Sequence, residues 1–193
     1  MDKNQKRKAI AAFVVSAIAI AGIQIREGFT DHAIIPIPGD VPTYGYGSTI
    51  KADGSKVTLQ DKITRADANK LLVDTVNKTY AEGVVRCAPD LLLHQYEFDF
   101  LVDSAYNLGV NRVCNSSMIQ KFRRGDYAGG CAAIRLYKYA AGKDCTVPAN
   151  RCGGIPKDRE RAYKMCMWGD YGVPSREEAT IAAKHMQEPK LPN

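Results

Sequence analysis

Apolar residues recur at helical spacing through most of the chain after Thr64. The stretch from Thr64 to Arg86 opens with a Thr suited to a helix N-cap and an Asp three residues later, and then runs apolar at helical spacing. A second helix is indicated by one apolar stripe that ends at Gly109. The stripe comprises Phe98, Leu101, Ala105 and Leu108.

The later part of the chain predicts further helices. One is capped by Ser116 or Ser117 and stops at Gly125, and the next runs to about Ala140. The last clear helix opens near Pro156. The stretch 173–193 adds a short helix before a polar tail.

The segment from Glu27 to Gly54 has a different pattern. It is rich in Gly, Pro, Thr and Tyr, alternates in "TYGYGSTI", and holds an Asp53-Gly54 pair typical of a hairpin turn. A small β region followed by helices predicts an α+β fold, mostly helical with a small β lobe near the N-terminus. Two lobes that meet beside such a loop form a cleft, where functional sites usually lie.

The N-terminus resembles a membrane-targeting segment. Basic residues precede an uncharged run from Ala9 to Ile25, which as a helix is about 25 Å long. That is marginal against a hydrocarbon core of about 30 Å, and Ala and Gly make the run weakly apolar. The basic flank predicts a cytoplasmic N-terminus with the rest exported. A cleaved signal peptide with Ala19-Ile20-Ala21 as cleavage site, a permanent anchor, a reversible anchor and a buried helix all stay open.

Composition narrows the class of protein. With 193 residues and 45% hydrophobic residues, the chain can bury one core. The net charge of +6 indicates an anionic partner, but no basic block interleaved with aromatics points to nucleic acid. Six cysteines without metal-ligand spacing predict disulfides in an oxidising compartment rather than a metal site. Cys145 and Cys152 enclose a short loop and are the pair best supported by spacing.

Glu27 is the candidate for acid chemistry. A Glu behind an apolar segment and at a lobe junction can have a raised pKa, which suits a general acid. Glycosidic cleavage needs a second carboxylate, and Asp31 and Asp40 lie nearby, with Thr43 to orient a water. Nucleophilic Ser or Cys chemistry and a phosphate-binding loop lack their motifs. A purely structural Glu27 remains the alternative.

Separated motifs then give the chain a family resemblance. They are Glu27-Gly28, "PGDVPTYGYGST", "YNLG" at 106–109, "RRGDYAGGC" at 123–131 and "RERAYKMCMWG" at 159–169. In this order, and over residues 9 to 169, they resemble the phage lysozymes, in particular lambdoid-type endolysins with a signal-anchor-release (SAR) N-terminus. The resemblance implies a two-lobed α+β lysozyme fold. It also implies an N-acetylmuramidase that cuts peptidoglycan between N-acetylmuramic acid and N-acetylglucosamine in host lysis, without a cofactor.

The resemblance also implies site residues. The acid of the family falls on Glu27 and its Thr on Thr43. The Asp of the family falls on Pro36 or Ile37, so we assign its role to Asp40, with Asp31 as second choice. Three further residues match the family: Tyr46 and Asn107 on the substrate side, and Arg159 as the Arg that reaches the acid. Asn107 as a helix end and Arg159 as a solvated charge are the structural alternatives.

The family resemblance divides the chain into an anchor, 1–25, and a catalytic domain, 26–193. We expect the protein in the host inner membrane facing the periplasm, then released to the periplasm as a monomer that acts on peptidoglycan and not on nucleic acid. The anchor has no Cys, so release by repositioning is favoured over thiol exchange. The expected disulfides are Cys87–Cys166, Cys114–Cys131 and Cys145–Cys152.

Two rival functions stay open. One is an anchored peptidoglycan-binding module without catalysis, in which the shifted Asp marks a lost activity. The other is a lysozyme secreted by a cleaved signal peptide.

Overall fold

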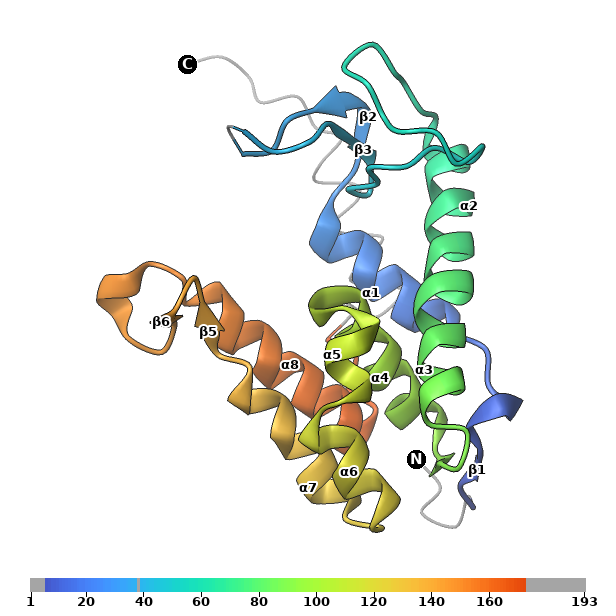
Figure 1. Cartoon of the computed structure of the whole chain (residues 1–193), viewed down its shortest axis with the longest axis vertical. Coiled ribbons are helices and arrows are strands. Elements are labelled where there is room, and N and C mark those ends of the chain that lie inside the picture. The colour runs from blue at the N-terminus through green and yellow to red at the C-terminus, as the bar shows by residue number, and fades with distance from the viewer. Residues whose placement is uncertain (1–5, 38, 173–193) are drawn as a thin grey trace, which may run out of the picture.

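Helices make up most of the computed structural model, which describes residues 6–37 and 39–172 (Figure 1). The α-helices are α1 Ala17–Glu27, α2 Arg65–Thr75, α3 Glu82–Cys87, α4 Gln95–Leu108, α5 Val110–Cys114, α6 Ser117–Arg123, α7 Tyr127–Ala132 and α8 Gly154–Trp168. The antiparallel strand pairs are β1 Lys8–Ala9 with β4 Leu92–Leu93, β2 Thr30–Ile34 with β3 Thr43–Gly45, and β5 Tyr139–Ala140 with β6 Lys143–Asp144. The α+β expectation is confirmed. The short helix expected within 173–193 lies outside the described residues.

Local signals in the sequence set several helix ends. Thr64 Oγ1 accepts the backbone N–H of Asp67 at 3.1 Å, which caps α2. A wider helical turn, η2 (Val76–Ala81), joins α2 to α3, so that the helix predicted from Thr64 is continuous in Figure 1. Ser116 caps α6, and α4 ends at Gly109, whose φ is +87°. These predictions are confirmed.

One predicted helix ends too late. The helix expected to reach Ala140 stops at the short 3-10 turn η3, Ala133–Leu136, and the chain then forms the β5–β6 hairpin. The hairpin turn holds Ala141 and Gly142 at φ of 46° and 75°. A turn with two consecutive positive φ values joins antiparallel strands and cannot continue a right-handed helix.

The main core forms around α4. Phe98, Phe100, Leu101 and Ala105 of this helix are fully buried. A smaller cluster of Ala33, Tyr44 and Val57 supports the β2–β3 lobe. In Figure 1 the continuous helix from α2 to α3 runs from this lobe down to the helical lobe, and α1 leads into β2 between them.

The N-terminal apolar run packs into the domain rather than forming one long helix. Its first half holds β1 and the 3-10 turn η1 (Ile10–Ala12), and Phe13 stacks on Phe98 with ring centroids 5.5 Å apart. Ser16 then caps α1, because its Oγ accepts the N–H of Ala19 at 3.2 Å. Among the described helices, none has the length and apolarity needed to cross a membrane.

Helix packing decides which cysteines meet. Cys145 and Cys152 form the predicted loop disulfide, with a Cα–Cα distance of 4.9 Å. The other two predicted pairings are wrong, because the structure joins Cys87 to Cys114 and Cys131 to Cys166. Cys87 and Cys114 end α3 and α5, which pack together, and α7 packs on α8 in the same way. A disulfide needs Cα atoms within about 7 Å, which only the packed helices provide.

Candidate active site

Glu27 is the last residue of α1, at the junction of the two lobes. Gly28 follows with φ of +70° and donates its N–H to Gln24 O at 3.1 Å, which ends the helix and turns the chain into β2. The β2–β3 hairpin then brings the chain back to Glu27. A Cβ built on Gly47 would lie 3.7 Å from Glu27 Oε2, so the loop after β3 runs close beside the carboxylate.

The surroundings of Glu27 favour its protonated form. Partial burial raises the pKa of the Glu27 carboxyl, because desolvation disfavours its charge. Asp103 and Asp158 raise this pKa further, whereas Arg26 lowers it. Two tyrosines complete the surroundings. Tyr80 and Tyr106 pack with ring centroids 5.1 Å apart, and burial together with the nearby charge of Glu27 raises the pKa of both phenols.

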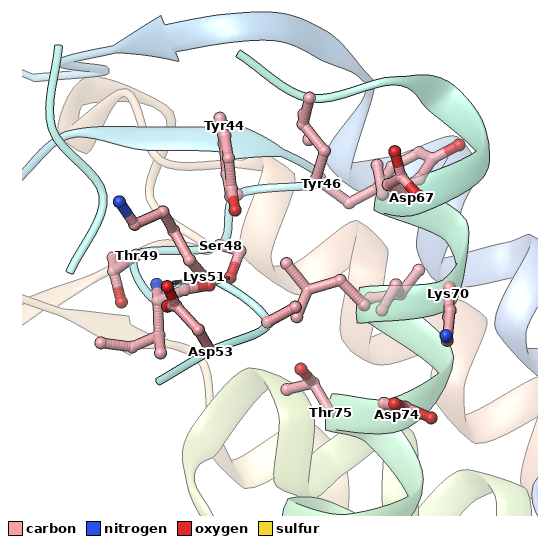
Figure 2. Close-up of a pocket in the computed structure, with 18 of the residues that line it drawn as sticks. Tyr44, Tyr46, Ser48, Thr49, Lys51, Asp53, Asp67, Lys70, Asp74 and Thr75 are labelled. Carbon is pink, nitrogen blue, oxygen red and sulfur yellow. Dashed lines mark hydrogen bonds between the residues drawn. The ribbon is translucent and has the colours of Figure 1, made fainter. Parts of the chain in front are cut away.

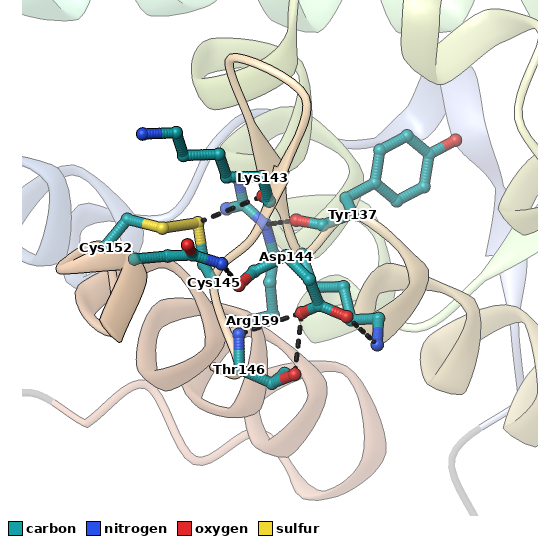
Figure 3. Close-up of a disulfide and its surroundings, with 9 residues drawn as sticks. Tyr137, Lys143, Asp144, Cys145, Thr146, Cys152 and Arg159 are labelled. Atoms are coloured by element: carbon teal, nitrogen blue, oxygen red, sulfur yellow. Dashed lines mark hydrogen bonds and ion pairs between the residues drawn. A yellow bond between two sulfur atoms is a disulfide. The ribbon is translucent and has the colours of Figure 1, made fainter. Parts of the chain in front are cut away.

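Among the described residues, Arg159 forms its hydrogen bonds and its ion pair with groups other than Glu27. Its Nε donates to Tyr137 O at 3.0 Å (Figure 3). Its Nη1 donates to Asn107 Oδ1 at 3.1 Å and to Asp158 Oδ2 at 2.8 Å. These bonds direct the buried guanidinium toward the segment before the β5–β6 hairpin. Within the described residues Glu27 forms no ion pair.

An open cleft of about 1230 Å³ lies between the loop after β3 and the face of α2 (Figure 2). Glu27 is not among the described residues that line it, but Gly47, which approaches the Glu27 carboxylate, is. Tyr46, Tyr80 and Tyr106 line it. Charged side chains of both signs surround the opening, namely Asp31, Lys51, Asp53, Lys62, Asp67, Lys70, Asp74 and Lys78. Aromatic rings and polar groups in one open groove suit an extended polar polymer such as a glycan strand.

The two candidates for the second carboxylate occupy different places. Asp31 lies in β2 and lines the cleft, and its hydrogen bond with His32 Nδ1 lowers its pKa. Asp40 is exposed in the β2–β3 connection, is not among the described residues that line the cleft, and accepts the N–H of Val41 at 2.8 Å. Thr43 begins β3 and pairs with Ile34. The hairpin that carries all three residues is thus attached directly to Glu27.

Tyr46 and Asn107, the two residues expected to bind substrate, differ in exposure. Tyr46 is buried at the cleft, and its hydroxyl donates to Asn69 Oδ1 at 2.8 Å. The hydroxyl of Tyr106 donates to Tyr46 O at 3.4 Å. Asn107 is exposed in the last turn of α4 and orients Arg159. Through this hydrogen bond Asn107 helps to hold Arg159 of α8 in place.

Sequence reasoning missed the residues that surround Glu27. Tyr80 and Tyr106 lie at helical positions that read as ordinary core, and Arg26 and Asp103 read as isolated charges. The one available signal is that Tyr106 begins the "YNLG" motif. For residues 6–37 and 39–172, no group of three or more His, Cys, Asp or Glu side chains is arranged to hold a metal ion.

Comparisons with known proteins identify the family of the chain. The phage lysozyme family model matches residues 24–152. A SAR-endolysin of Enterobacteria phage PA-2 is 29% identical over 173 residues, covering 84% of this chain and 96% of that protein. An endolysin of Salmonella phage P22 is 28% identical over 148 residues, covering 77% and 95%. A solved endolysin from Escherichia coli O157:H7 phage FAHEc1 superposes with a TM-score of 0.68 at 25% identity, covering 85% of this chain and 98% of that one.

The match covers both lobes and includes Glu27, the cleft and the β2–β3 hairpin. The resemblance drawn from the separated motifs is therefore confirmed, and so is the two-lobed lysozyme fold. The chain belongs to the phage lysozyme family and is a peptidoglycan-lysing glycoside hydrolase.

Proposed function

We propose that this lysozyme cleaves the bond between N-acetylmuramic acid and N-acetylglucosamine, with Glu27 as the general acid. Its protonated carboxyl donates to the leaving glycosidic oxygen. Asp40, with Thr43, holds a water that attacks the anomeric carbon from the opposite face, which inverts its configuration. The supporting observation is a glutamate whose pKa is raised by desolvation, placed at the lobe junction beside an open cleft.

Measuring new reducing ends tests this activity. Purified peptidoglycan is digested with the full-length protein, and the products are reduced with borohydride and identified. Reduced N-acetylmuramic acid is the expected product end. Reduced N-acetylglucosamine would assign the cut to the other bond. Binding to the polymer without any release of sugar would favour the non-catalytic binding module.

We also infer that the N-terminal segment is a reversible anchor that docks into the domain after release from the inner membrane into the periplasm. Three buried carboxylates on α4 support this inference. Glu97, Asp99 and Asp103 are 2%, 0% and 4% exposed. Each is bound by the N-terminal segment: Arg7 pairs with Glu97 at 2.7 Å, Ser16 Oγ donates to Asp99 at 2.6 Å, and Arg26 pairs with Asp103.

These contacts can form when the N-terminal segment is packed on the domain, but not all of them can form while it lies in the membrane. Without the segment, Asp99 keeps Gln95 and Tyr171 as partners. Asp103 keeps Arg161, whereas Glu97 loses the cation that pairs with it. A buried carboxylate that loses its cation is strongly destabilising.

With residues 9–25 in the bilayer, Arg7 on the cytoplasmic side cannot reach Glu97. The docked segment also ends α1 at Glu27, which places the acid at the cleft. Release then completes the active site.

Arg7→Gln tests the docking contact. The substitution leaves Glu97 buried without its cation and removes the guanidinium that lies 3.4 Å from the ring centroid of Tyr127. We expect the free energy of unfolding of the released protein to fall by about 2 kcal/mol. Chemical denaturation measures this change.

Lys8→Gln is the matched control, because it removes the same charge from the same basic flank and its side chain is exposed. Its free energy of unfolding should not change, while retention in the membrane should weaken equally in both variants. Equal stability of the two variants would contradict the docking contact. The mass of the mature protein separates reversible anchoring, which leaves the N-terminus intact, from a cleaved signal peptide.

A further inference from the structure

The guanidinium next to the proposed acid is turned away from it. Arg26 precedes Glu27 in the last turn of α1, yet its Nη2 donates to Asp103 Oδ1 on α4, and its Nε lies 3.8 Å from Asp158 Oδ1 on α8. The Arg26 side chain is 22% exposed, so the two carboxylates hold it largely out of solvent. Arg26, the cation closest in sequence to Glu27, is therefore paired with the carboxylates of Asp103 and Asp158.

Arg161 pairs with the same two carboxylates as Arg26. Its Nη2 donates to Asp103 Oδ2 at 2.6 Å and lies 2.9 Å from Asp158 Oδ1. Arg159 also pairs with Asp158, at 2.8 Å, so three guanidinium groups share two carboxylates in one cluster. An Arg that is paired with carboxylates stabilises a neighbouring carboxylate less than an uncompensated Arg within a few ångströms does, because the paired anions oppose its field.

We propose that Asp103 and Asp158 are positioning residues for the acid: they hold Arg26 in this cluster and prevent it from forming an ion pair with Glu27. The inference rests on the proposed role of Glu27. It explains why the desolvated acid lacks an ion pair among the described residues although an Arg directly precedes it.

The other groups around Glu27 are consistent with this role. Tyr80 and Tyr106 face it with neutral phenols, since the pKa of each is raised. Gly47 approaches the carboxylate without a side chain. Arg159 pairs with Asp158 and also donates to Tyr137 O and Asn107 Oδ1. Burial raises the pKa of Glu27 most, and Arg26 is the cation that opposes this by lowering it.

Asp158→Asn tests the proposal through the pH profile of kcat/KM on soluble peptidoglycan fragments. The loss of one carboxylate leaves the cluster with excess positive charge near Glu27. The high-pH limb, at which the acid loses its proton, should move down by about one pH unit. Glu160→Gln is the matched control, because Glu160 lies on the same helix and pairs with Arg135 at 2.8 Å, away from the cluster. Its limb should stay in place.

Arg26→Gln provides the opposite change. It removes the cation, so the limb should move up, and it should also restore the limb in combination with Asp158→Asn. If the circular-dichroism spectrum shows that Asp158→Asn does not fold, Arg26→Gln alone tests the proposal. In a folded Asp158→Asn variant, a rate limb and a Glu27 pKa that both stay in place would overturn the proposal.

A titration separates this inference from the role of Glu27. Carbon-13 NMR follows the Glu27 carboxyl, identified as the resonance missing from Glu27→Gln. If its pKa falls in Asp158→Asn while the rate limb stays, the positioning effect stands and Glu27 is not the acid. If its pKa does not move, the positioning role is refuted whatever the activity.

Discussion

Glu27→Gln should lower kcat for peptidoglycan by about 10²- to 10⁴-fold, because the amide cannot deliver a proton to the leaving oxygen. The fold should persist, since the side chains have nearly the same shape and Glu27 has no hydrogen-bond partner within the described residues. Reducing-sugar release by purified wild type and variant measures the loss, and thermal unfolding checks the fold.

The matched control is Glu82→Gln. Glu82 is an exposed glutamate on α3 that pairs with Arg86 at 3.3 Å and is not among the residues that line the cleft. Its loss should leave the rate unchanged. A Glu27→Gln variant that cuts as fast as the control would exclude Glu27 as the acid.

The same substitution predicts a pH dependence. The pKa of Glu27 is raised above that of a free glutamate, about 4.3, so the proton persists into less acidic solution. Activity should therefore be full below the raised pKa and fall as the pH increases through it. The residual rate of Glu27→Gln should lack this limb. A wild-type limb at the value of a free glutamate would contradict the effect of desolvation.

Asp40→Asn should give the second-largest loss, also about 10²- to 10⁴-fold in kcat, if its carboxylate activates the water. The asparagine can still accept the N–H of Val41, so the loop keeps that contact. Thr43→Ala should cost less, because the hydroxyl orients the water without taking its proton.

Asp31→Asn is the discriminating comparison. Asp31 lines the cleft and is held by His32, whereas Asp40 lies on the connection between β2 and β3. A large loss in Asp31→Asn with an active Asp40→Asn would transfer the role to Asp31. Proton NMR of the first product anomer reports the stereochemistry. Inversion supports an attacking water between carboxylates roughly 6.5–9.5 Å apart, and retention would point to a carboxylate nucleophile.

Features that depend on bonds between residues close in sequence could be predicted from the sequence. The Thr64 and Ser116 caps and the Gly109 helix end depend on bonds within one turn of chain, so their residue types predict them. The Cys145–Cys152 pair closes a short loop in the same local way. The separated motifs identified the family, and Glu27 lies at the lobe junction as its position after the apolar run suggested.

Contacts between elements that are distant in sequence could not be predicted from the sequence. Two disulfides were assigned to the wrong partners, because the partner of Cys87 depends on α3 packing against α5. Asp158, Arg159 and Arg161 are close in sequence, but the rotation of α8 about its axis directs Arg159 toward Tyr137 and the other two toward Arg26. A motif predicts that a residue lies on a helix, but it does not predict which neighbouring elements its side chain contacts.

The sequence by itself determined the lysozyme family, the α+β order, most helix ends and a glutamate suited to acid chemistry, because each follows from local bonds or from motifs in order along the chain. Tertiary structure alone decided the environment of that glutamate. Tyr80, Tyr106, Asp103 and Asp158 come from three elements and meet Glu27 only after packing. Desolvation and charge–charge interactions depend on distances in space, so the raised pKa of Glu27 exists only in the folded protein.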